Sequence, residues 1–302
     1  MQVVKRFLTP KLIGAILVFI TTTLGSVVVF RLVEVLRDKS TRLTLPTEPR
    51  AERVVFPREE PQQLVDIFTG EDTLRYHGYE MRRLTEKVSY GRKSELLVSY
   101  AALVKNDHRL FKFDGVYFVE GNSTEFGLFN LLGNDSKQFI VSQTVPRGGR
   151  HWVVSVTPEF HVLFDSADYS AGREEFYVID IDKDGVYEIS LPLTAFYEMQ
   201  DKMYIGEIPL PEMIFKYDPG AGKYVLANHL FPEYALYGIG LDIDRLRTDD
   251  GSNYLSKRLD IMLRLILAGK SEQGWAFFNR EYDRPDKVEI RNRIAGILKR
   301  KL

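Results

Sequence analysis

Cysteine is absent from the 302-residue sequence. Its absence excludes disulfide bonds, thiolate metal sites and cysteine nucleophiles, although it does not identify a cellular compartment. The chain also has almost no net charge, −1 at neutral pH, so the overall balance points to neither nucleic acid nor a strongly anionic surface as partner. Charged residues make up 27% and aromatic residues 12% of the chain, which is typical of a folded globular protein.

The common catalytic motifs are missing as well. The five histidines are scattered, without the HExxH or paired spacing of a zinc site. There is no GxSxG elbow and no glycine-rich phosphate loop. We therefore predict a protein that is not an enzyme. The alternative is an envelope hydrolase or carbohydrate-binding protein, which requires four side chains to converge in one concave pocket: His151, Asp168, Glu174 and Glu175.

One long segment without charge is present, at 12–30, with the sequence LIGAILVFITTTLGSVVVF. At 1.5 Å rise per residue, a helix of this length covers most of a hydrocarbon core of about 30 Å. We predict a short basic tail at 1–11 and a transmembrane anchor helix at 12–36. A cleaved signal peptide is the competing interpretation, but its apolar region is normally about 7–15 residues and ends at a small-residue site.

The orientation of the anchor is not decided by its flanks, because basic residues occur on both sides in similar number. A domain that follows such an early anchor is usually exported. We therefore expect a single-pass membrane protein whose domain is periplasmic or extracellular, with other membrane or envelope proteins as partners. A small-molecule substrate is not indicated.

Three segments follow the predicted anchor. Residues 37–62 contain four prolines among charges and no sustained apolar period, which predicts an extended, semi-rigid linker. Residues 63–230 form short apolar or alternating runs separated by turn residues, which predicts a β-rich domain. Residues 231–302 change to helical spacing. Helices are expected over 254–268, from Ser271 and from Pro285, with their apolar stripes forming helical hairpins.

The β-rich segment contains a possible internal repeat. The sequences LFKFDG, VLFDS and IFKYDP each end an apolar strand in an aspartate, at Asp114, Asp165 and Asp218. Their spacing of about 50 residues matches one four-stranded propeller blade, although three blades are too few to close a propeller. The predicted fold is therefore a β-rich extramembrane domain, propeller-like or sandwich-like, with C-terminal helical hairpins and one N-terminal transmembrane helix.

The motif with the clearest chemistry is DIDKDGVYE at 180–188. Alternate carboxylates surround a tight turn in which Gly185 permits a positive φ, and a hard cation such as Ca²⁺ prefers six to eight oxygen ligands. It is not an EF-hand, because position twelve is Leu191 and the flanking residues predict strands. We predict five ligands for a structural Ca²⁺ ion: Asp180, Asp182, Asp184, the carbonyl group of Val186, and Glu188.

A last acidic ligand at position nine, between two strands, resembles the calcium loop of FG-GAP repeats, the blades of integrin-α-type propellers. The resemblance covers 174–191, and it implies that the aspartates and Glu188 bind Ca²⁺ at a propeller rim. The presumed equivalent turns depart from the pattern: 131–139 keeps only Asp135, and 90–96 has no aspartate. One calcium site is therefore implied. Together these features predict a membrane-anchored, non-enzymatic module for protein interaction or complex assembly.

Overall fold

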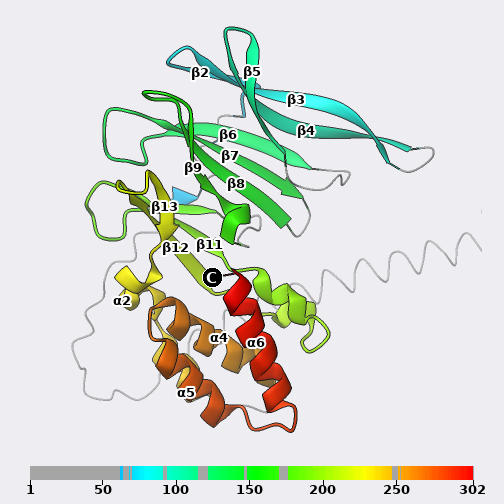
Figure 1. Ribbon diagram of the computed structural model, residues 1–302, viewed down its shortest axis with the longest axis vertical. Coiled ribbons are helices and arrows are strands. Elements are labelled where there is room, and N and C mark those ends of the chain that lie inside the picture. The colour runs from blue at the N-terminus through cyan, green and yellow to red at the C-terminus, as the bar shows by residue number, and fades with distance from the viewer. Residues whose placement is uncertain are drawn as a thin grey trace, which may run out of the picture. The chain divides into compact units, whose positions relative to one another are not determined.

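The computed structural model describes residues 62–63, 68, 70–90, 94–114, 122–145, 148–169, 176–246, 251 and 253–301 (Figure 1). All of them belong to one compact unit, Glu59–Leu302. The predicted tail, anchor and nearly all of the linker lie outside the described residues. Within the described part, no helix is long and apolar enough to cross a membrane.

Three antiparallel sheets follow one another along the chain. The first sheet contains β2 (Thr73–Tyr76), β3 (Tyr79–Tyr90), β4 (Ser94–Lys105) and β5 (His108–Phe113). The second contains β6 (Ser123–Phe129), β7 (Gln138–Val145), β8 (Gly148–Ser155) and β9 (His161–Asp165). The third contains β10 (Tyr177–Ile179), β11 (Glu188–Pro192), β12 (Glu212–Asp218) and β13 (Lys223–Leu226), with β1 (Gln62–Gln63) beside β10. In each sheet the four main strands are neighbours in chain order.

Tight turns explain why neighbouring strands pair. The β2–β3 turn contains His77 and Gly78, and the β4–β5 turn contains Asn106 and Asp107. All four residues have positive φ, between 50° and 76°. Two successive positive φ values are the conformation that matches the twist of an antiparallel hairpin, and Gly, Asn and Asp adopt it most readily.

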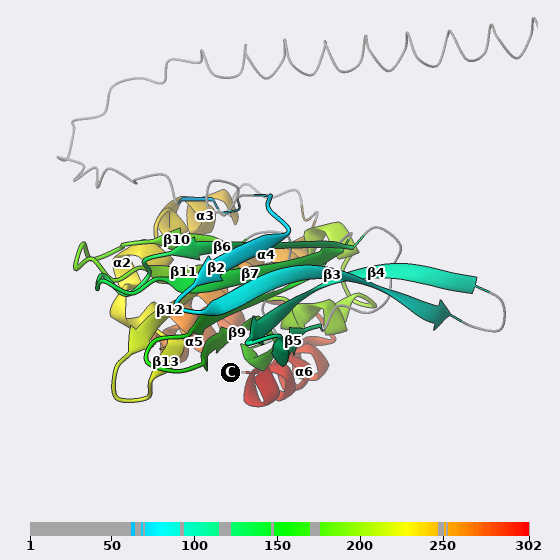
Figure 2. The same ribbon diagram turned by 90° about the horizontal axis from the view of Figure 1, so that it is seen from above.

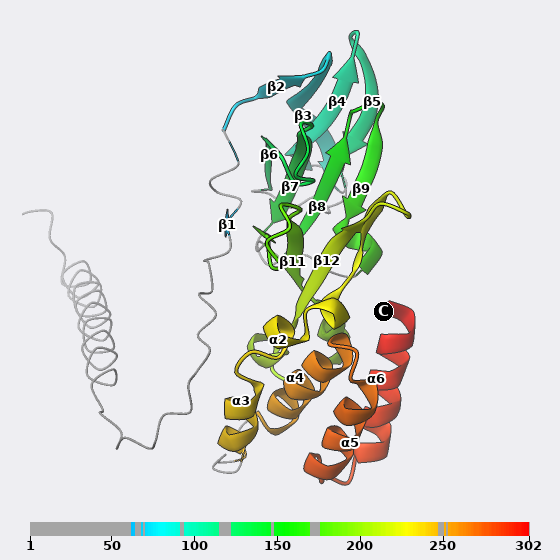
Figure 3. The ribbon, with the colours of Figure 1, turned by 90° about the vertical axis from the view of Figure 1, so that its left-hand side faces the viewer.

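The second sheet is the middle layer, because its two faces belong to different cores. On β7, Phe139 and Val141 pack with the first sheet in one cluster, whereas Ile140 packs with the third sheet in another. On β8, Trp152 and Val153 divide between the two clusters in the same way. The period of two in a strand produces this division, and Figure 3 shows the second sheet between β2–β5 above and β11 and β12 below.

The β3–β4 hairpin is longer than its neighbours and projects beyond β2 and β5 (Figure 2). It is fastened to the second sheet at Ser99. The side-chain amide of Asn122 accepts a hydrogen bond from the Ser99 backbone N–H at 3.1 Å and donates one to its carbonyl oxygen at 2.7 Å. Thr124 and Gln143 donate to the same carbonyl oxygen. Side chains of the second sheet thus replace a neighbouring strand at this point.

The C-terminal helices confirm the predicted apolar stripes. They are α4 (Tyr254–Leu267), α5 (Ser271–Glu281) and α6 (Lys287–Lys301), and their buried side chains join the core of the third sheet. The second of these helices begins at Ser271, as expected, with Lys270 at the cap position and no side-chain cap. Shorter elements complete the unit: η3 (Ser166–Tyr169), η4 (Ala195–Met199), η5 (Ile205–Glu207), η6 (Asn228–Leu230), α2 (Pro232–Ala235) and α3 (Ile239–Leu246).

The internal alignment of the predicted repeat is wrong, although the first strands of the three sheets do begin roughly 50 residues apart. Asp114 follows β5 and Asp165 ends β9, both fourth strands, but Asp218 ends β12, a third strand. The segment 90–96 connects second and third strands, so it is not equivalent to 131–139 or 180–188. In the described part of the chain, the sheets close neither a barrel nor a propeller.

Candidate functional site

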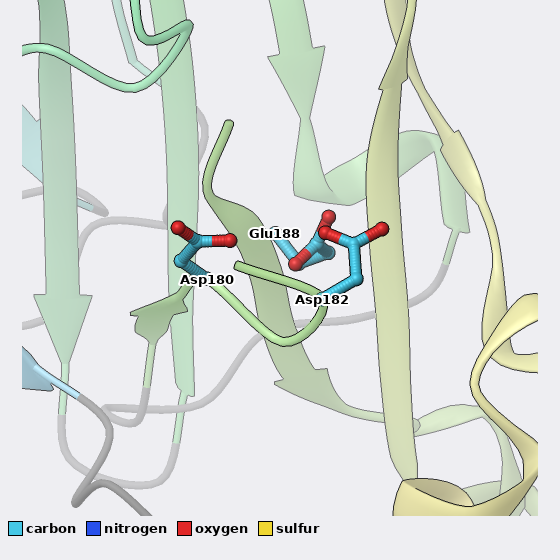
Figure 4. A group of neighbouring side chains, drawn as sticks. All are labelled: Asp180, Asp182 and Glu188. Atoms are coloured by element: carbon cyan, nitrogen blue, oxygen red, sulfur yellow. The ribbon is translucent and has the colours of Figure 1, made fainter. Parts of the chain in front are cut away.

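The acidic loop (180–188) connects β10 to β11, the first two main strands of the third sheet. Asp182 and Asp184 are exposed and Asp180 is half-buried, whereas Glu188, the first residue of β11, has no exposed surface. Figure 4 shows Asp182 and Glu188 close together beside β12, with Asp180 across the loop. The carboxylate groups are therefore presented at different depths on one side of a sheet.

Backbone N–H groups of the loop are satisfied by its own carboxylates. Asp180 accepts hydrogen bonds from Asp184 N at 3.1 Å and Gly185 N at 3.0 Å. Asp184 accepts one from Val186 N at 2.8 Å, and Glu188 accepts one from the backbone N of residue 181, also at 2.8 Å. Gly185 has φ 83°, which confirms the predicted left-handed turn.

A lysine that the sequence analysis missed occupies the middle of this cluster. The ammonium group of Lys216, on β12, lies 2.8 Å from Asp182, 2.9 Å from Asp184 and 2.9 Å from Glu188. The register of the sheet explains its position. Ile189 pairs with Phe215, and Lys216 follows Phe215 on the strand next to β11. The sequence signal was present in IFKYDP, but the strand pairing was needed to interpret it.

The pKa values of the cluster follow from burial and from this lysine. Burial raises the pKa of Glu188, although hydrogen bonds from the residue-181 N–H and from Lys216 act in the opposite direction. Lys216 and the Val186 N–H lower the pKa of Asp184. Burial acts to lower the pKa of Lys216, but its bonds to the carboxylates outweigh burial and raise that pKa. Lys216 is accordingly a cation throughout the physiological pH range.

The predicted calcium ligands are brought together only in part. Oxygen atoms of Asp180, Asp182 and Glu188 lie within 4.8 Å of one another, so these three side chains could hold a metal ion. Asp184 is outside that group and faces Lys216. The Val186 N–H donates a hydrogen bond to Asp184, and the role of the Val186 carbonyl group as a ligand stays a prediction. An all-oxygen set of this kind suits a hard cation such as Ca²⁺.

The acidic loop touches its counterpart in the second sheet, the loop between β6 and β7. Tyr187 N donates a hydrogen bond to Leu131 O at 2.8 Å. A Cβ atom on Gly133, which has φ 64°, would lie only 2.4 Å from Gly185 O. Glycine at position 133 therefore permits a backbone approach that no other residue there would allow without a shift.

Of the four residues that the enzyme alternative requires, the structure describes two, His151 and Asp168. His151, on β8, has no exposed surface, and its Nδ1 atom lies 3.0 Å from the hydroxyl group of buried Ser142. Asp168 is exposed in η3. Glu174 and Glu175 lie outside the described residues. The ring of His151 also packs against Phe176, at 5.0 Å between ring centroids.

Comparison with known proteins adds no further assignment, because no family model, curated protein or solved structure matches this chain.

Proposed function

We propose that this protein is a non-enzymatic module that binds another membrane or envelope protein and contributes to the assembly of a complex. The observation that carries the proposal is a concentration of exposed apolar side chains at 230–241. Leu230 is 58% exposed, Tyr237 75% and Leu241 58%. Exposed apolar groups on a folded surface often mark protein interfaces, in which tyrosine is enriched. We call this stretch the 230–241 segment.

The secondary structure of the segment supports an interface. It spans the end of η6, the short helix α2 and the start of α3, and α3 has no buried residue. It is nevertheless held in place, since the Arg264 side chain donates hydrogen bonds to Tyr237 O and to Asp242. A fixed surface with exposed apolar side chains loses little conformational freedom when it binds.

Site-specific photocrosslinking tests this surface. A benzophenone amino acid replaces Tyr237 in the full-length protein in its own cells, and Tyr204, which is 72% exposed, is the matched control. We expect one discrete adduct with a membrane or envelope protein from position 237, and its loss when Leu241→Glu is added. Equal yields from both positions, or an adduct insensitive to Leu241→Glu, would contradict the proposal.

The module is proposed to be held at a membrane by residues 12–36, with its domain on the periplasmic or extracellular side. The support is the uncharged segment 12–30, whose length suits a bilayer core. We expect the protein to resist alkaline extraction from membranes and its domain to be cut by protease added from outside. Mass spectrometry of the purified protein should detect its N-terminal segment. A mature chain that begins after residue 26 would identify a cleaved signal peptide instead.

The three sheets are proposed to be successive units of a propeller-like array related to FG-GAP repeats. The support is that each sheet is an antiparallel meander of four strands in chain order, and that the equivalent loops touch at Gly133 and Gly185. An experimental structure of the full-length protein tests this directly. Blade-like rotation of each sheet against the next about one axis is expected, and a parallel stack would favour the sandwich-like alternative.

The acidic loop is proposed to bind a structural Ca²⁺ ion. The support is the oxygen cluster of Asp180, Asp182 and Glu188, with the charge of Asp184 nearby. Sites of this type in extracellular modules bind in the range of about 10⁻⁴–10⁻³ M, which agrees with an exported domain. Isothermal titration of full-length protein should show Ca²⁺ binding that Asp182→Asn weakens. An Asp135→Asn variant, in the β6–β7 loop, should bind as the unmodified protein does.

A further inference from the structure

The acidic loop already contains a cation in the structure, and that cation is a side chain of the protein itself. Lys216 donates hydrogen bonds to three carboxylates from two directions, the loop and the start of β11. Its side chain is only 20% exposed. The ring of Phe231 lies 5.6 Å from the ammonium group on a further side. These contacts give the lysine a defined position rather than a loose surface pairing.

The loop is hydrogen-bonded without a metal ion. Each of the four carboxylates accepts at least one hydrogen bond, either from a loop N–H group or from Lys216. The buried Glu188 shows the dependence most clearly, because one of its oxygen atoms faces a backbone N–H and the other faces Lys216. A buried carboxylate without a compensating charge would be strongly destabilising.

The oxygen atoms held by Lys216 are also those that a metal ion would need. Asp182 and Glu188 belong to the oxygen cluster, and both contact the ammonium group. A divalent ion bound to these oxygen atoms would lie close to the ammonium group. The two would repel each other, since both are positive and the surroundings are partly buried. The two cations therefore exclude each other.

We propose that Lys216 is the resident cation of the acidic loop, so that Ca²⁺ binds only by displacing it. The role of Lys216 as resident cation stands on its contacts alone, whereas its displacement by Ca²⁺ rests on the calcium site proposed above. Lys216 accordingly sets the affinity of the loop for Ca²⁺. The loop then has two states, one closed on its own lysine and one closed on a metal ion.

The test uses the full-length protein stripped with a chelator and the variant Lys216→Met, which keeps most of the side-chain volume and removes the charge. In chelator, the variant is expected to melt at a lower temperature than the unmodified protein. Added Ca²⁺ is expected to restore most of the loss and to bind the variant at least tenfold more tightly. Lys112→Met is the matched control, because Lys112 also contacts two carboxylates, Glu86 and Asp114, away from the loop. It should leave Ca²⁺ affinity unchanged.

The outcomes separate the two proposals. A Lys216→Met protein that is as stable as the unmodified protein in chelator overturns the role of Lys216. So does a Lys216→Met protein that binds Ca²⁺ no more tightly than an unmodified protein that does bind it. Loss of stability in chelator with no Ca²⁺ binding by either protein refutes the calcium site and leaves Lys216 as the resident cation. If Lys216→Met does not fold, adding Glu188→Gln should restore folding, because the uncompensated buried charge is gone. Failure of that double variant to recover also overturns the role of Lys216.

Discussion

Gly133→Ala tests the contact between the acidic loop and the β6–β7 loop. The added Cβ atom would lie 2.4 Å from Gly185 O, about 1 Å closer than the ordinary range that begins near 3.4 Å. Because the atom it meets belongs to the backbone, no side-chain rotation can relieve the contact. One of the two loops has to move, and the hydrogen bond from Tyr187 N to Leu131 O lies between them.

The expected magnitude has two parts. Alanine at a left-handed position costs about 1–2 kcal/mol, reduced by about 0.4–1 kcal/mol because glycine is more flexible in the unfolded chain. Overpacking adds about 1–3 kcal/mol and the weakened hydrogen bond about 0.5–1.5 kcal/mol. Gly78→Ala isolates the first part, since Gly78 has φ 76° and no atom within 4 Å of its added Cβ. We expect Gly133→Ala to lose about 3 kcal/mol more than Gly78→Ala.

Urea denaturation of both variants, followed by circular dichroism, measures the difference. For a unit of this size, about 3 kcal/mol corresponds to a fall in melting temperature of roughly 6–12 °C beyond the control. Equal losses in the two variants would show that the loops do not approach each other as the structure has them. The close contact between successive sheets would then have to be abandoned.

Three further substitutions test contacts elsewhere in the fold. Hydrogen bonds from Arg293 lower the pKa of Asp201, so Asp201→Asn should make the protein less stable at neutral pH. The difference in stability between variant and unmodified protein should vanish as the pH falls through the lowered pKa. A difference in stability that is unchanged at pH 3 would contradict this. Asn122→Ala removes both amide hydrogen bonds to Ser99 and should cost about 1–2 kcal/mol in urea denaturation, whereas no loss would exclude the strand-like role of the amide. Phe278→Ala empties a fully buried position in α5 and should cost about 3–5 kcal/mol, so a loss below 1 kcal/mol would place this helix outside the core.

Local signals in the sequence predicted the elements well where one face is buried. The stripe at 254–268 predicted α4, because leucine and isoleucine recur at helical spacing and lie in the core. The short apolar runs of 63–230 predicted strands such as β7, but they could not show which residues face which neighbour. Phe139 and Ile140 belong to different cores only because sheets pack on both sides of β7.

Features that depend on pairing between distant strands were not predictable from one sequence. The aspartate of IFKYDP, Asp218, resembles the other two in its local pattern, yet it ends a third strand rather than a fourth. The same fragment contains Lys216, which is 28 positions from Glu188 in sequence and 2.9 Å from it in space. The Asp-rich motif was visible because its acidic residues lie within nine positions of the sequence, whereas its counter-charge comes from a neighbouring strand. Spacing along the chain carries no information about such a contact.

The acidic loop and the 230–241 segment share a small apolar cluster, so the two proposals can be tested together. Ile181 from the loop packs with Phe231 and Tyr234 beside α2, and Phe231 also faces Lys216. Protein interiors are close-packed, so displacement of Lys216 by Ca²⁺ should shift this cluster and the segment next to it. We expect Ca²⁺ to change the crosslinking yield at position 237 and not at position 204, and Lys216→Met to make that change occur at lower Ca²⁺. A Ca²⁺ response of equal size at both positions would mean that the ion acts on the whole protein or its partner rather than through this cluster.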